Sequence, residues 1–150
     1  MIIGIDPGKN GGVAFIPDTD EIEAKAVKCP ETPHEMAEII TRAHLLSRDY
    51  NEKTFAVLEK VHSMPKQGVV STFTFGTNYG MWKGILAAHK IPWIDVTPHK
   101  WQKFYGVMPK EKKSRKHKLK SLAYQYYPDI KVNLTTADAI LLAHWFKNNG

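Results

Sequence analysis

The sequence contains very little cysteine and no long apolar run. Its single cysteine, Cys29, excludes an internal disulfide, and without a cysteine–histidine cluster we expect no zinc site. The longest apolar runs span about five to six residues, whereas a membrane-spanning helix needs roughly 20. The N-terminal letters MIIGID enter a strand pattern directly, without the basic segment of a signal peptide. We therefore expect no membrane association and a reducing, cytoplasmic setting.

The positive charge is concentrated in one segment of a chain whose length predicts a single domain over residues 1–150. The chain carries a net charge of +6, with 43% apolar and 24% charged residues, as in ordinary globular proteins. Residues 110–120 hold seven basic side chains and one acid, so the remainder is formally neutral. This distribution favours a polyanionic partner, nucleic acid first, over the alternative of a merely solvated helix face.

The order of apolar patterns predicts an α/β domain. Residues 2–6 and 11–16 are typical of two hairpin strands, and the alternating segment 21–29 predicts a third strand. Buried-strand patterns at 54–59 and 92–96 then alternate with helix patterns. We expect a mixed sheet flanked by helices, with an antiparallel meander followed by parallel strands in crossover units.

Two helix patterns carry more specific expectations. The letters TPHE at 32–35 form a capping box with proline at the first helical position. In the helix expected to end near residue 90, Gly76, Gly80 and Gly84 are spaced four apart. Glycines are unfavourable in helices, so a face of three indicates close approach of another backbone. That backbone belongs either to this chain's own sheet or to a second copy of the protein.

Three acidic residues, Asp6, Glu59 and Asp138, accompany apolar runs that span nearly the whole chain. Each has a simple structural explanation: Asp6 as a turn residue, Glu59 as a strand end reaching the surface, and Asp138 as part of a capping box with Thr135. Converging carboxylates are also the usual way to hold divalent cations with oxygen ligands. The three together therefore predict a metal site.

The motifs around these acids resemble a known family. IGIDPGKNGGVAFI, the strand ending at Glu59, and ADAILLAHW resemble the RuvC-like Holliday junction resolvases of the RNase H-like superfamily. FTFGTNYGMWKGILAAHKIP and TPHKWQKFYG resemble its shorter, phage-type branch. The resemblance implies an RNase H-like fold with a five-stranded mixed sheet, and a homodimer that cuts symmetric strands of a four-way junction. For a phage protein the setting is the host cytoplasm.

The resemblance also assigns roles to residues. Asp6, Glu59 and Asp138 match catalytic acids that hold two Mg²⁺ ions, for which Mn²⁺ substitutes, and Thr135 stands where the family has a fourth acid. We expect Asp6 to bridge both ions. The family's DNA-contacting residue after the glutamate falls at His62. The further DNA-binding candidates are basic: Lys60, Lys66, Lys100, Lys103, Lys112, Lys113, Arg115 and Lys116.

The predicted function is metal-dependent, structure-selective cleavage of four-way junctions by phosphodiester hydrolysis. One alternative is a broader nuclease that also cuts flaps and three-way junctions. Another is a non-catalytic junction-binding module, which Thr135 favours. Actin-like phosphotransferases share the opening strand, acid and glycines, but they need two such domains, and 150 residues allow one.

Overall fold

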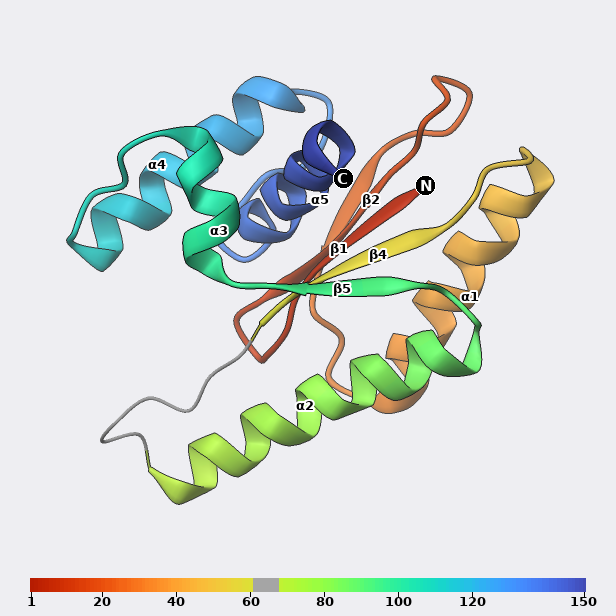
Figure 1. The fold of residues 1–150 in the computed structure, drawn as a ribbon, viewed down its shortest axis with the longest axis horizontal. Helices are drawn as coiled ribbons and strands as arrows, with labels where there is room; N and C mark the ends of the chain where they lie inside the picture. Colours follow the sequence, from red (N-terminus) through yellow and green to blue (C-terminus); the bar gives the residue numbers. More distant parts are fainter. Residues whose placement is uncertain (61–67) are drawn as a thin grey trace.

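The computed structural model describes residues 1–60 and 68–150, which form a five-stranded mixed sheet with helices on both faces (Figure 1). The strands are β1 (Ile2–Asp6), β2 (Gly12–Ile16), β3 (Lys25–Lys28), β4 (Phe55–Glu59) and β5 (Trp93–Val96). The helices are α1 (Pro33–Asp49), α2 (Val69–Ala88), α3 (Pro98–Gln102), the 3-10 turn η1 (Lys103–Tyr105), α4 (Lys112–Tyr126) and α5 (Ala137–Asn149).

The sheet order is β3-β2-β1-β4-β5. Antiparallel pairing joins β1, β2 and β3, and parallel pairing joins β1 to β4 and β4 to β5. The expected meander followed by parallel crossover strands is thereby confirmed. The third strand is shorter than the predicted 21–29, because its partner β2 ends at Ile16 and Pro17 follows, which leaves no ladder beyond Lys25.

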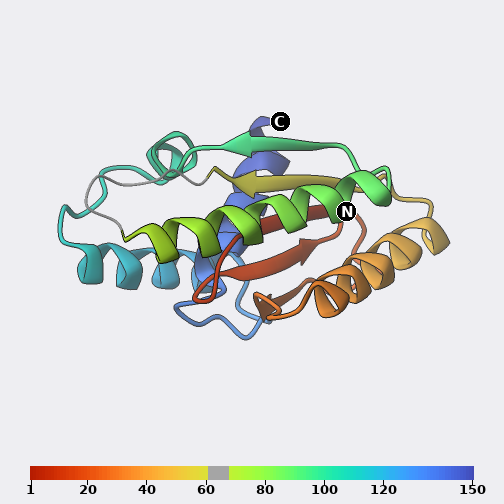
Figure 2. The same ribbon diagram turned by 90° about the horizontal axis from the view of Figure 1, so that it is seen from below.

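The core has two layers because successive strand residues point to opposite faces of the sheet. Ile3 and Ile5 belong to the layer under α1 and α2, whereas Ile2 and Val57 belong to the layer under α5. Figure 2 shows the sheet between these helical layers, and the short helix α3 and helix α4 share the α5 side. Helix α5 is hydrophobic nearly all round, as expected for a helix buried over most of its surface.

Helix α5 packs closely on the central strand at Gly4. A Cβ atom at this position would lie 2.1 Å from the carbonyl oxygen of Ala139, so only glycine allows the helix to approach this far. Asp138 immediately precedes Ala139 in the first turn of α5. The close packing therefore holds that turn, and the carboxylate it carries, beside β1.

The capping box of α1 is confirmed: the Thr32 side chain accepts a hydrogen bond from the Glu35 N–H, and the Glu35 carboxylate accepts one from the Thr32 N–H. Of the two alternatives for the glycines of α2, the approach of this chain's own sheet is excluded. A Cβ built at any of the three glycines of α2 meets nothing within 4 Å, and α2 packs on the sheet through Trp82 and Leu86 instead. In the described ranges, no helix combines the length and apolar character needed to cross a membrane.

Candidate active site

Three carboxylates meet at one edge of the sheet. Strands β1 and β4 run parallel and end at Asp6 and Glu59, with Ile5 paired to Leu58, so the two acids leave the sheet side by side. The first turn of α5 brings Asp138 to the same place. All three line one cavity of about 1150 Å³. The predicted convergence of the acids in one site therefore agrees with the geometry.

Burial and the repulsion between neighbouring acids disfavour the ionised forms of Asp6 and Glu59. Burial raises the pKa of Asp6 well above its usual value, and the charges of Glu59 and Asp138 raise it further. Burial likewise raises the pKa of Glu59 to about 7, with a further contribution from Asp138. A hydrogen bond from Trp101 and the charge of Lys116 oppose this rise. Such a site gains from binding a cation.

Glu59 is positioned by a tryptophan that sequence reasoning did not assign to the site. Helix α3 begins at Pro98 after the N-cap Thr97 and carries Trp101, whose side chain is fully buried. The Trp101 indole Nε1 donates a 2.7 Å hydrogen bond to Oε2 of Glu59. The sequence does show a tryptophan, a residue whose N–H needs a hydrogen-bond partner when buried, one turn into the helix that follows β5. Strand β5 lies beside β4, which ends at Glu59.

Lys116 is part of the carboxylate cluster rather than a peripheral basic residue. Its Nζ lies 2.5 Å from Oδ2 of Asp138, and both side chains are mostly buried. Burial opposes the lysine's charge, but Asp138, Asp6 and Glu59 together raise the pKa of Lys116. The other oxygen of Asp138, Oδ1, is buried and has no hydrogen-bond partner among the described residues. An unpaired buried carboxylate oxygen is costly and suits a cation ligand.

The donor set fits a hard divalent cation, since it consists of carboxylate oxygens and includes the orphaned Oδ1 of Asp138. Among residues 1–60 and 68–150, no three acidic, histidine or cysteine side chains are arranged, as they stand, so that they could hold a metal ion. Trp101 and Lys116 each occupy one carboxylate oxygen. The site is thus a cluster of interacting charged side chains, in which two carboxylate oxygens already accept hydrogen bonds from Trp101 and Lys116.

The turn before α5 differs from the predicted capping box of Thr135 and Asp138. The Oδ1 atom of Asn133 accepts hydrogen bonds from the Thr135 N–H (2.9 Å), the Thr135 hydroxyl (2.6 Å) and the Thr136 N–H (3.0 Å). Thr136 is the N-cap, with no side-chain cap bond. Asn133 therefore satisfies the Thr135 N–H, which the Asp138 carboxylate would satisfy in a capping box, and the Thr136 N–H as well. The Asp138 carboxylate remains directed to the cavity, which Thr135 also lines.

Helix α2 forms the opposite wall of the cavity, which the sequence did not reveal. Asn78 Oδ1 accepts a 2.9 Å hydrogen bond from the N–H of Gly8, in the loop that follows Asp6. The ring of Phe75 lies against the same glycine. The N-terminal half of α2 is thereby fixed to the loop that carries the first carboxylate.

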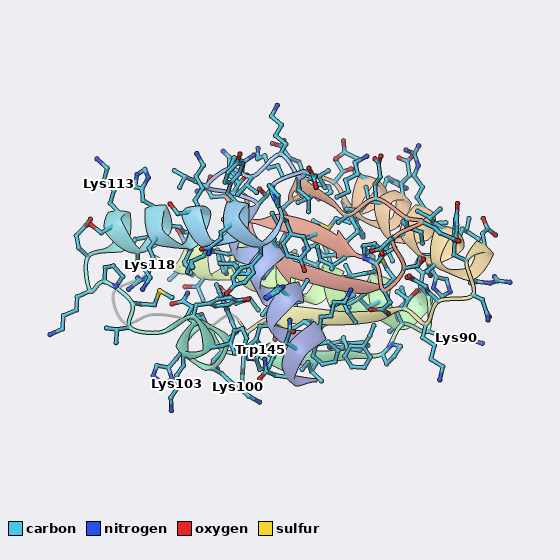
Figure 3. All side chains as sticks on the ribbon, turned by 90° about the horizontal axis from the view of Figure 1, so that it is seen from above. Lys90, Lys100, Lys103, Lys113, Lys118 and Trp145 are labelled. Atoms are coloured by element: carbon cyan, nitrogen blue, oxygen red, sulfur yellow. The ribbon has the colours of Figure 1, made fainter. Side chains whose placement is uncertain are left out.

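The basic candidates fall into distinct places. Lys112, Arg115 and Lys116 line the carboxylate cavity, together with Lys9, which sequence reasoning missed. Lys113 is exposed on α4 and does not line the carboxylate cavity, and Figure 3 shows it at the far end of the molecule from Lys90.

The remaining candidates lie outside the carboxylate cavity. Lys60 is exposed just after β4. Lys103 lines an adjoining cavity, and the Lys100 Nζ lies 5.6 Å from the ring centre of Trp145. His62 and Lys66 fall outside the described residues.

Comparisons with known proteins support the fold. No protein-family model matches the chain, and no curated protein matches it in sequence. RuvC of T. thermophilus in complex with a Holliday junction substrate superposes with a TM-score of 0.61 at 14% identity, covering 99% of this chain and 95% of RuvC. A second Thermus thermophilus RuvC structure gives 0.59 at 16% identity, covering 99% and 96%. The yeast mitochondrial Holliday junction resolvase Ydc2 gives 0.49 at 14% identity, covering 97% and 76%. The chain therefore has the RuvC fold, a variant of the RNase H-like fold, as the resemblance of its motifs implied.

Proposed function

We propose that this protein is a metal-dependent endonuclease that cleaves four-way DNA junctions. The observation that carries the proposal is the cavity in which Asp6, Glu59 and Asp138 converge beside the basic side chains of α4. Buried acids that raise one another's pKa bind divalent cations, and basic walls bind phosphates. The RuvC fold, whose Thermus representative binds a Holliday junction, supports this substrate class.

The three carboxylates would hold two Mg²⁺ ions, with Asp6 contributing to both and Mn²⁺ as a substitute. When bound, such ions would activate water for attack on the phosphodiester and would stabilise the charge that develops on the leaving 3′ oxygen. Trp101 positions Glu59 by donating a hydrogen bond to Oε2, so that Oε1 would be the oxygen available to an ion. Lys116 positions Asp138 in the same way and adds a positive charge beside the scissile phosphate.

Binding of the junction rests on basic side chains around the cavity. Phosphate contacts supply affinity with strong salt dependence and little sequence information, so recognition of the branch is by shape. Lys112 and Arg115 are best placed because they line the cavity. The proposed DNA-binding set also includes Lys60, His62, Lys66, Lys100, Lys103, Lys113 and Lys116.

The open face of α2 favours a homodimer. Gly76, Gly80 and Gly84 are uncovered, and Val69 and Phe73 continue the same helical stripe with 85% and 75% of their surface exposed. An apolar stripe of this kind marks an interaction site, and bare glycines allow two helix backbones to approach closely. A second copy of the chain is the partner that supplies the second active site needed to cut both strands of a junction.

The test is a panel of end-labelled four-way junctions, three-way junctions, flaps and linear duplexes incubated with the protein and Mg²⁺. The proposed function predicts cleavage of the four-way junction at symmetric positions, with little cleavage of duplex. Equal cleavage of flaps and three-way junctions would replace it with a general branched-DNA nuclease.

A non-catalytic junction-binding module is the second candidate, because Thr135 hydrogen-bonds to Asn133 and provides no fourth carboxylate. Tight junction binding without cleavage in Mg²⁺ or Mn²⁺ would establish it.

A further inference from the structure

A second cavity adjoins the carboxylate cavity on the outer side of α3. Its volume is about 690 Å³, within the range of about 300–1000 Å³ typical of ligand sites. It shares Pro98, Gln102 and Arg115 with the carboxylate cavity, so the two spaces meet. The full lining is Pro98, His99, Gln102, Lys103, Gly106, Val107, Met108 and Arg115.

The charge of this second cavity is positive or neutral throughout. His99, Lys103 and Arg115 line it and no acid does. In the described part of the chain, none of the three forms an ion pair with a carboxylate. Among the described residues, the Arg115 guanidinium donates to the Pro109 carbonyl alone, at 3.4 Å, which leaves most of its N–H donors available for a ligand. Unpaired cations in a shared hollow select an anion.

The floor is shaped by a backbone conformation that only glycine adopts readily. Gly106 ends η1 with φ 84° and ψ −163°, and a Cβ built on it meets nothing within 4 Å. Glycine is therefore required at this position by the backbone conformation of the turn and not by the space around it. Having no side chain, Gly106 leaves its backbone exposed beside Val107 and Met108. The cavity thus offers an apolar surface next to its cations.

Helix α3 connects this cavity to the catalytic carboxylates. One side of the helix carries Trp101, which hydrogen-bonds to Glu59. The other side carries His99 and Gln102, which line the second cavity. A ligand in the second cavity consequently lies one short helix away from Glu59. Figure 3 shows Lys103 projecting from this part of the molecule, well separated from Lys113 on α4.

We propose that this second cavity binds one unstacked nucleotide of the cleaved DNA strand, close to the scissile phosphate. The nucleotide's phosphate contacts Lys103 and Arg115, and its base lies against Val107 and Met108. Unstacking is least costly where base pairing is already interrupted, as at a branch point. Inorganic phosphate alone would pair with the cations, but it would neither fill the cavity nor contact Val107 and Met108. The inference rests on the proposed function, since it presumes a DNA strand in the carboxylate cavity.

The probe is a four-way junction with 2-aminopurine placed, one position at a time, within three nucleotides of the branch. Binding and fluorescence are measured in EDTA, so the outcome does not depend on cleavage. We expect one position to gain fluorescence on binding to wild-type protein, because its base leaves the stack. Lys103→Ala and Val107→Asp should abolish that gain and weaken binding about tenfold, the effect of losing one bound base.

Matched variants separate the cavity from general charge and from misfolding. Lys90→Ala removes an exposed lysine elsewhere on the molecule and should keep both the fluorescence gain and the affinity. Val107 is 90% exposed, so Val107→Asp should leave the thermal unfolding midpoint unchanged.

Unchanged fluorescence at every position, or a gain that survives both cavity variants, would overturn the inference. Absence of Mg²⁺-dependent cleavage with these binding results intact would instead overturn only the proposed function.

Discussion

The indole N–H of Trp101 and the carboxylate of Glu59 are joined by a 2.7 Å hydrogen bond between α3 and the end of β4. The bond holds the side chain of a partly buried acid whose pKa is raised to about 7 by desolvation, and it favours the ionised form that a metal requires. The same tryptophan belongs to the core layer under α5. One side chain thus links the packing of the fold to the chemistry of the site.

Trp101→Phe should lower metal affinity while the fold is retained. Removing a donor that orients a ligand typically reduces metal affinity or activity by about 10- to 100-fold. The Mg²⁺ concentration needed for half-maximal cleavage should therefore rise by at least about tenfold. Trp82→Phe is the matched control, because Trp82 is equally buried but its Nε1 has no hydrogen-bond partner among the described residues. An equal rise in both variants would assign the effect to packing.

Lys116→Met should destabilise the metal-free protein at pH 8 by about 1–3 kcal/mol, because it leaves Asp138 among other acids without its buried partner. Because the lysine is partly exposed, this loss of stability should be smaller than the loss expected for a fully buried ion pair. Mg²⁺ should restore much of the lost stability by supplying positive charge. Urea unfolding in EDTA and in Mg²⁺ measures both effects. Lys120→Met, an exposed substitution on the same helix, should change neither curve, and a loss as large as that of Lys116→Met would contradict the assignment.

The metal-free protein should lose stability as pH rises from about 4.5 to above 7. The pKa of Glu59 is higher in the folded state than its usual value of 4.5, so the folded state binds more protons across this window. The contribution of protonated Glu59 is complete below pH 4.5 and is lost as pH rises through about 7. The loss is about 3 kcal/mol, because the pKa rises from 4.5 to about 7 and each pKa unit corresponds to about 1.4 kcal/mol. Asp6 adds in the same direction.

Urea unfolding in EDTA at several pH values tests this dependence. Glu59→Gln keeps an oxygen acceptor for Trp101 but removes the titration, so its stability should vary less between pH 5 and 8. A wild-type protein whose stability rises over that interval would show that other groups dominate.

Gly80→Ala distinguishes a dimer face from a solvent-exposed one. The added Cβ meets nothing within 4 Å in a single chain, so an uncovered helix should become about 1 kcal/mol more stable. If a second copy packs on this face, the methyl group should instead weaken dimerisation by about tenfold, as overpacking does. Sedimentation equilibrium measures the dissociation constant. A monomeric wild-type protein, stabilised by the substitution, would contradict the proposed dimer.

The strand segments and the three acids could be predicted because they depend on local patterns. Apolar runs that end in Asp6 and Glu59 fix strand ends, and parallel pairing then places those ends together. The capping box at Thr32 is similarly local, and the structure confirms it. By contrast, Thr135 and Asp138 fit the same local pattern, but the Thr135 N–H donates to Asn133 instead of to the Asp138 carboxylate.

Contacts between distant segments could not be read from the sequence. The ion pair of Lys116 with Asp138 depends on how α4 packs against α5, and Lys116 was indistinguishable from its basic neighbours. The role of Trp101 depends on β5 lying next to β4, which no local pattern shows. The glycine face of α2 was equally compatible with the sheet or a partner until the buried side of the helix was known.

The most direct measurement is single-turnover cleavage of a four-way junction in Mg²⁺ by wild-type protein and by Asp6→Asn, Glu59→Gln and Asp138→Asn. Junction binding in EDTA and the unfolding midpoint are measured alongside, so that folding and affinity are controlled. We expect each substitution to reduce the cleavage rate by at least about 100-fold, the scale of losing a metal ligand or its orientation, with binding retained. Cleavage at the wild-type rate by any of the three variants would contradict the assignment of these carboxylates as the catalytic centre.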